Sequence, residues 1–359
     1  MPAHKNHHYV PRCYMRPFLA GSERKTINLH NIRSARSVRC APMKNQCSAP
    51  YVHGKEDLRL EHALGEIETA YARALREVIA GERPTGEDIG RLLAFIMLQF
   101  SRTKAVMERL RSMITGMERE IRSSTTGRLP DVHTSARAMM LSSLGLYEKV
   151  APAVLDLPPC FVRNTSRVEF VTSDDPVCFT SRFHATRNIQ TFGIASSGVM
   201  FFMPLTPRLL PLCHNRNVYT VRGIGGFVET KSARDVEACN ELQYLNALEN
   251  VYFGDWAQKA GVEAKSAELR EKRPPSRTRF TRFEKDGLSS GGILRYRRMT
   301  PGRGLERDSM IIGASAVHIF SEKWLSKVRF RGRRTEASTR SCAEKSSRPQ
   351  QTLGIDRTA

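Results

Sequence analysis

The stretch "LLAFIMLQFSRT", residues 92–103, begins with the longest apolar run of the chain. Apolar residues recur at helical spacing around it, from Ile89 through Phe100 to Leu110, and this pattern predicts a helix that starts near Thr85. Gln99 interrupts the run, which is also too short to cross a bilayer. The stretch therefore predicts an amphipathic helix with an apolar face and no membrane segment.

Further elements are expected on both sides of this helix. Apolar residues from 60 to 78 and from 134 to 150 predict two more helices, and residues 231–249 predict another. Residues 26–32 alternate as a strand does, and short β-prone runs divided by turn residues follow "DLPPC" (156–160). We therefore expect an α+β fold, with a helical N-terminal half packed with a small, mainly antiparallel sheet.

The C-terminal part of the chain has a different composition. Apolar periodicity fades near residue 255, and residues 261–359 hold 23 Lys and Arg against 11 Asp and Glu, a net charge of +12 out of +21 for the chain. The sequence thus predicts a single domain over 1–255 and a basic, mostly disordered extension over 256–359. A chain that ends at Ala260 should then fold as well as the full chain, and the extension should bind polyanions without sequence preference.

Targeting and cysteine patterns indicate a cellular location. The N-terminus lacks the apolar core of a secretory signal, and the eight cysteines form no CxxC pair and no zinc pattern. We therefore expect a soluble, cytoplasmic protein with reduced thiols and no membrane association.

Several short blocks, taken in order, resemble a known bacterial family. They are "NHHYVPRCYMRPF" (6–18), "LEHALGEIE" (60–68), "FIMLQFSRT" (95–103), "VTSDDPV" (171–177), "MPLTPR" (203–208) and "CNELQYLNALENVYFG" (239–254). Together they resemble the family called domain of unknown function 4238 over roughly residues 4–255. The resemblance implies a prokaryotic, soluble α+β protein and no particular activity.

The histidines before Pro11 are the first candidate site residues. His7 and His8 are adjacent, so in an extended segment they point to opposite sides. We expect His8 to lie within reach of Glu61, Gln99, Arg102 or Asp174, and His7 to be more exposed. His8 then either moves protons or binds a metal, or it packs before a helix.

The helices supply three more candidates. Glu61 is either a solvated helix charge or a catalytic group. Gln99 and Arg102 share a stripe with apolar residues, where a buried polar group must be paired. Arg102 then either forms a bridge to a carboxylate or grips the phosphate or carboxylate of a ligand.

Asp174 and Asn240 complete the set. Asp174 and Asp175 stand before Pro176, as in an ordinary turn, but paired carboxylates there can also hold Mg²⁺ or act as a general base. Asn240 lies among apolar residues of the last helix as a buried hydrogen-bonding or ligand-binding residue.

Two function classes are compatible with these residues. One is a ligand-binding or structural module, which we favour because no arrangement requires catalysis: the chain has no P-loop, HExxH or GxSxG motif. The other is a metal-dependent hydrolase, a phosphoesterase or nuclease, in which His8, Glu61 and Asp174 ligate a divalent metal or move protons and Arg102 holds phosphate.

Overall fold

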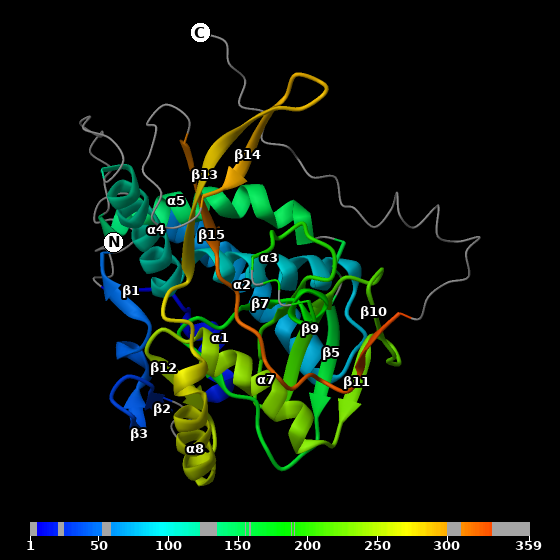
Figure 1. Ribbon diagram of the computed structural model, residues 1–359. Coiled ribbons are helices and arrows are strands. Elements are labelled where there is room, and N and C mark those ends of the chain that lie inside the picture. The colour runs from blue at the N-terminus through cyan, green and yellow to red at the C-terminus, as the bar shows by residue number, and fades with distance from the viewer. Residues whose placement is uncertain are drawn as a thin grey trace.

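The computed structural model describes residues 6–20, 25–51, 59–122, 135–154, 156–157, 159–187, 189, 191–299 and 310–331. Helices and several small, mostly antiparallel sheets make up an α+β fold (Figure 1). The helices are α1 (Arg12–Met15), α2 (Arg59–Ala80), α3 (Gly86–Arg102), α4 (Lys104–Arg122), α5 (Ala136–Val150), α6 (Arg182–Ala185), α7 (Ala233–Asn246) and α8 (Lys259–Leu269). None of the helices that the structure describes is long and apolar enough to span a membrane.

The two largest sheets have five and four strands. The first has the order β11 (Phe227–Thr230), β5 (Pro159–Asn164), β9 (Leu209–His214), β8 (Met200–Phe202), β7 (Cys178–Thr180). The second has the order β3 (Arg36–Pro42), β2 (Thr26–Asn31), β12 (Asn250–Phe253), β6 (Thr172–Ser173). All neighbours in these two sheets are antiparallel except β11 and β5.

Three smaller pairings complete the strands. They are β1 (Asn6–His8) with β4 (Ser48–Pro50), β10 (Tyr219–Val221) with β16 (Val328–Phe330), and β13 (Thr278–Leu288) between β14 (Leu294–Arg298) and β15 (Met310–Ala316). The expectation of one small sheet is therefore wrong. Strands β1 to β4 precede the long helix α2, so the N-terminal half is not uniformly helical.

Both faces of the five-stranded sheet are buried. On β8, Phe201 belongs to the hydrophobic cluster of helices α1 to α5, whereas Met200 and Phe202 belong to a second cluster that includes α7 and α8. Alternate residues of a strand point to opposite faces. The sheet therefore separates two cores, which explains why "VMFFM" (199–203) is continuously apolar.

Helix α3 is the central element of the first core. Thr85 caps it through a capping box with Asp88, a local signal that was visible in the sequence. The predicted continuation to Leu110 is wrong, because α3 ends at Arg102 and Thr103 has an extended backbone. The Thr103 hydroxyl accepts the Val106 N–H at 3.3 Å and so begins the new helix α4.

Ordered elements continue between residues 256 and 331, where the sequence predicted low order. Helix α8, the β13–β15 sheet and β16 lie there, and Ile319, Leu325 and Val328 are buried in the second core. The division into domains at residue 255 stays a prediction, and residues 332–359 lie outside the described residues.

Candidate functional site

Arg102 forms the bridge that the sequence allowed as one of two alternatives. Its side chain is fully buried and donates from Nη2 to Glu68 Oε1 at 2.7 Å. Its Nε donates to the Tyr9 carbonyl at 3.1 Å, and Nη2 also lies 3.5 Å from the His8 carbonyl. Arg102 therefore ties α3 to α2 and to the segment before α1.

The two histidines have the opposite roles to those expected. His7 is only 3% exposed, and its Nε2 lies 3.9 Å from Glu61 Oε2. The His8 ring lies 3.1 Å from the Gln46 carbonyl, and only the His8 backbone contacts Arg102. The prediction failed because strand alternation separates the two rings without saying which one faces inward; pairing of β1 with β4 decides that.

Gln99 is fully buried, as expected, but it is not part of this bridge. Within the part of the chain that the structure describes, neither atom of its amide has a hydrogen-bond partner. Gln99 lies on α3 one turn after Phe95, whose ring stacks on Tyr71 with centroids 3.6 Å apart. Gln99 therefore lies in the hydrophobic core, and no polar contact among the described residues indicates a binding or catalytic role for it.

Asp174 fastens the end of α7 to the strand region. Its carboxylate accepts the backbone N–H groups of Leu248, Glu249 and Asn250 at 2.8 to 3.0 Å. Burial and the neighbouring Asp175 raise the pKa of Asp174 to about 6, although the three N–H groups favour the ionised form. The Asp174 carboxylate therefore has a structural role, because it holds the backbone of residues 248–250.

The raised pKa of Asp174 predicts a pH dependence of folding. The pKa of Asp174 in the folded state lies above its usual value near 3.8, which applies to the unfolded chain. The folded state therefore binds this proton more tightly than the unfolded state, and protonation stabilises the protein at acid pH. The free energy of unfolding should therefore fall as the pH rises from about 4 through about 6, and the total decrease due to Asp174 should be at most about 3 kcal/mol. Urea unfolding at several pH values should show a steeper loss over this window in the wild type than in Asp174→Asn; equal slopes would contradict the prediction.

Asn240 bonds to the backbone of the segment before β6. Its Nδ2 donates to the Glu169 carbonyl at 2.8 Å, and its Oδ1 accepts the Val171 N–H at 3.0 Å. Asn240 also lines a cavity of about 320 Å³ together with Tyr244 and Lys265. The Asn240 amide therefore hydrogen-bonds to the backbone at both of its polar atoms. A role of Asn240 in ligand binding stays a prediction.

The expected catalytic residues do not come together around one point. In the described ranges, no group of three or more His, Cys, Asp and Glu side chains could hold a metal ion, so His8, Glu61 and Asp174 form no common ligand set. The structure pairs Glu61 with His7 and places Asp174 at the end of α7.

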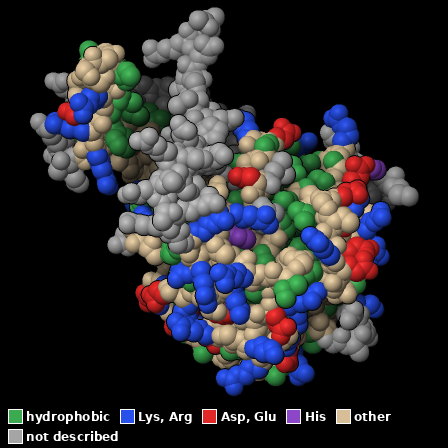
Figure 2. Space-filling model, turned by 90° about the vertical axis from the view of Figure 1, so that its right-hand side faces the viewer, with side chains coloured by type: hydrophobic (Ala, Val, Ile, Leu, Met, Phe, Trp, Pro, Cys, Tyr) green, Lys and Arg blue, Asp and Glu red, His purple; other side chains and the backbone are tan. Residues whose placement is uncertain are grey.

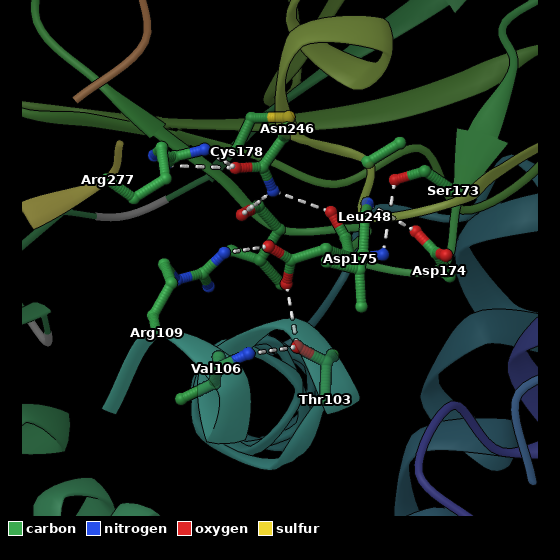
Figure 3. Close-up of polar contacts among 12 residues, drawn as sticks. Thr103, Val106, Arg109, Ser173, Asp174, Asp175, Cys178, Asn246, Leu248 and Arg277 are labelled. Atoms are coloured by element: carbon green, nitrogen blue, oxygen red, sulfur yellow. Dashed lines mark hydrogen bonds and ion pairs between the residues drawn. The ribbon is translucent and has the colours of Figure 1, made fainter. Parts of the chain in front are cut away.

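A cluster around Asp175 was not predicted (Figure 3). Asp175 is 1% exposed and accepts a hydrogen bond from the Thr103 hydroxyl at 2.8 Å. Its other carboxylate oxygen pairs with Arg109 Nη1 of α4 at 2.6 Å. The carboxylate thus holds the start of α4 against the turn that the Asp-Asp-Pro motif forms.

Asn246 links this cluster to the C-terminal part of the chain. Its Nδ2 donates to the carbonyls of Asp175 at 2.6 Å and of Val177 at 3.2 Å. Arg277 approaches from the other side, with both terminal nitrogens 3.3 and 3.4 Å from Asn246 Oδ1 and Nε donating to the Val317 carbonyl at 3.0 Å (Figure 3). A residue beyond position 255 therefore completes the surroundings of the Asp-Asp-Pro turn.

These residues border a cavity of about 230 Å³, which we call the arginine cavity. It is lined by Arg109, Arg273 and Arg277, with Glu108, Asn246 and the loop from Pro274 to Thr278 among the remaining lining residues. Burial, and then the positive charge of Arg109, lower the pKa of Arg277 to about 10, so it still carries its charge at neutral pH. Three cationic side chains thus meet at one cavity.

The sequence pointed to only part of this site. The Asp-Asp-Pro motif identified Asp175, but Arg109 reads as a surface charge of a helix. Arg273 and Arg277 stand in "EKRPPSRTRF" (271–280), which has the composition of a disordered tail. No pattern within that segment links it to residues so much earlier in the chain.

Comparison with known proteins agrees with the resemblance seen in the sequence. The profile of the family described as "Protein of unknown function (DUF4238)" matches residues 6–256, which is more than half of the chain. No curated protein and no solved structure matches the chain. Of the lining arginines, Arg109 lies within the matched residues, whereas Arg273 and Arg277 lie beyond them. The chain therefore belongs to the DUF4238 family of proteins of unknown function.

Proposed function

We propose that this protein is a ligand-binding module and that the arginine cavity holds a small anion bearing a phosphate or a carboxylate. The observation that carries the proposal is the meeting of Arg109, Arg273 and Arg277 at one cavity. Guanidinium groups bind such anions through two parallel N–H donors, which gives both strength and orientation.

The three arginines are not equally occupied. Arg273 donates to the carbonyls of Tyr244 and Ala247 at the C-terminal end of α7. The helix dipole stabilises a positive charge at that end. Arg109 uses one terminal nitrogen for Asp175, and its Nη2 and Nε have no protein partner among the described residues. Among the described residues, Arg277 makes long contacts to Asn246 and one hydrogen bond to the Val317 carbonyl. Arg109 and Arg277 are therefore the residues with donors to spare for a ligand.

The charge balance supports an anion and not a cation. The cavity lining contributes three positive side chains and the carboxylate of Glu108, and Asp175 lies behind Arg109. Asp175 is almost fully buried and fixes the direction of the guanidinium, as a preorganised binding site requires.

Titration calorimetry with inorganic pyrophosphate tests this proposal. We expect Arg109→Gln and Arg277→Gln each to weaken binding about tenfold or more, because a charge-assisted hydrogen bond contributes about 1.5–3 kcal/mol. Arg91→Gln is the matched control: Arg91 lies on α3 and pairs with Glu87 and Asp88, away from the cavity lining, so its affinity should be unchanged.

Two results would contradict the proposal. One is that the wild type binds no small anion, and the other is that both cavity variants keep wild-type affinity. In either case the arginines have only the structural role of attaching residues 273–277 to the end of α7. The melting temperature of each variant must stay close to that of the wild type for a loss of affinity to be attributed to the cavity.

The metal-dependent hydrolase has less support. His8, Glu61 and Asp174 share no ligand set in the described residues, and the Asp174 carboxylate already accepts three backbone N–H groups. Divalent-metal-dependent cleavage of a phosphate ester that Asp174→Asn abolishes, with the fold retained, would favour the hydrolase over a binding module.

A further inference from the structure

The sheet of β13, β14 and β15 extends away from the two cores. Its β13–β14 hairpin projects from the rest of the molecule (Figure 1). Figure 2 shows basic and hydrophobic side chains on this projecting lobe, at the upper left of that view. Leu288, Ile293 and Leu294 near its tip are 62%, 72% and 46% exposed, so the lobe is not part of either core.

One face of this sheet packs on α4. Phe280 lies so close to Gly116 of α4 that a Cβ at Gly116 would be 2.4 Å from the ring. Arg282 Nε donates to Glu120 Oε2 of α4 at 2.8 Å. Because alternate residues share a face, Phe280, Arg282 and Glu284 define the inner face of β13.

The opposite face is directed away from α4. On β13 it carries Arg279, Thr281, Phe283 and Lys285. The strand register places Arg298 opposite Phe283 and Tyr296 opposite Lys285 on β14, and Ile311 opposite Phe283 on β15. Residues directly opposite each other in an antiparallel pair point to the same face. We call this set of residues the outer face.

Aromatic and cationic side chains alternate on the outer face. Phe283 and Arg298 form one cross-strand pair, and Lys285 and Tyr296 form the next. Lys285 and Arg298 are exposed, and Tyr296 is 39% exposed. The Tyr296 ring therefore lies at an accessible surface next to positive charge, and the Phe283 ring beside it is partly exposed.

The acidic side chains of the hairpin lie on the other side. Glu284 and Asp286 both pair with Arg297, at 2.7 and 3.7 Å, and Glu284 is on the inner face with Arg282. No Asp or Glu occupies an outer-face position of β13, β14 or β15 in the described residues. The two faces thus differ in charge, and the outer face is cationic.

We propose that the outer face binds single-stranded nucleic acid. Lysine and arginine neutralise backbone phosphates, and exposed aromatic rings stack on bases, which are accessible in single strands and not in a duplex. An acidic protein would use the charge without needing the rings, and an anionic membrane is the competing partner that the vesicle measurement below tests. The site is separate from the arginine cavity, and each proposal can fail without the other.

Fluorescence anisotropy with labelled poly(dT) and the full chain tests this inference. Phe283→Ala/Tyr296→Ala should weaken binding at least tenfold because the rings no longer stack on bases. Lys285→Glu/Arg298→Glu should weaken binding at least tenfold, and the slope of log affinity against log salt should become about 1.4 less steep, as expected when two phosphates are no longer neutralised. A duplex of the same length should bind more weakly than the single strand.

The matched control is Arg33→Glu/Arg36→Glu, which makes the same charge change at exposed residues of the β2–β3 hairpin, in its turn and at the start of β3. We expect it to change affinity less than threefold. All variants should keep the wild-type melting temperature; Tyr296→Ala alone, a change at an exposed ring, serves if the double alanine variant does not fold.

Three outcomes would overturn the inference. The first is that the control and the outer-face charge variant lose affinity equally, which would mean that net charge alone drives binding. The second is that the alanine variants keep full affinity, which would remove the stacking role. The third is that the outer-face variants lose binding to vesicles containing anionic lipid while poly(dT) binding is unchanged, which would make the face a membrane surface.

Discussion

Ending the chain at Ala260 is expected to abolish the cooperative thermal transition. This truncation removes Val262 and Leu269 of α8 and the buried Ile319, Leu325 and Val328, all of which belong to the second core. Each buried aliphatic side chain contributes about 1.5–3 kcal/mol, and a whole domain is stable by only about 5–15 kcal/mol. Circular dichroism during heating measures the effect, and it reverses what the sequence predicted for this truncation.

The same truncation also removes buried hydrogen bonds, which increases its effect. The buried Thr180 hydroxyl donates to the Ile319 carbonyl at 2.8 Å, and the Ser321 hydroxyl donates to Glu241. A chain that ends at Arg331 keeps these hydrogen bonds and is the matched control, which should retain the transition. If the chain ending at Ala260 melts at the same temperature as the full chain, residues 261–331 do not belong to the core.

Replacing Arg102 by methionine is expected to lower the free energy of unfolding by about 3–5 kcal/mol. The guanidinium is fully buried and serves Glu68 and two backbone carbonyls, and removing one partner of a buried pair leaves the other partners unsatisfied. Methionine fills much of the same volume, so the destabilisation reports the polar interactions and not a cavity. Urea unfolding gives the difference.

The control for Arg102→Met is Arg91→Met on the same helix. Arg91 pairs with Glu87 and Asp88 near the protein surface, where such ion pairs contribute about 1 kcal/mol or less. Two results would refute the structural role of Arg102: a destabilisation no larger than that of Arg91→Met, or an unchanged stability together with a lost ligand.

Local patterns were sufficient for much of the secondary structure. The spacing of Leu64, Tyr71 and Leu75 predicted α2, and the apolar pattern predicted that α3 starts near Thr85. The α+β class followed from the change of pattern after "DLPPC", and the family followed from short motifs in order. These features are readable because helical periods, caps and turns depend on residues within about four positions of one another.

The arrangement of the site depended on contacts between distant residues. Strand alternation separated His7 from His8, but only the pairing of β1 with β4 turned His7 inward. Arg102 was identified as a residue that needs a partner, and its partner Glu68 is 34 positions away.

The sequence by itself determined several of the long helices, the α+β class and the family. The tertiary structure decided where α3 ends, that α8 is ordered, and which charged groups meet. Asp175 bonds to Arg109 on α4, and the Asn246 amide joins the turn to Arg277 from the basic segment after residue 255. A charged residue on a helix or in a loop has the same local pattern whether it is solvated or buried. Its partner is fixed only when packing of the sheet between two cores brings distant segments together. Burial makes an unpaired charge unfavourable, so a buried charged residue must lie next to a group that pairs with it.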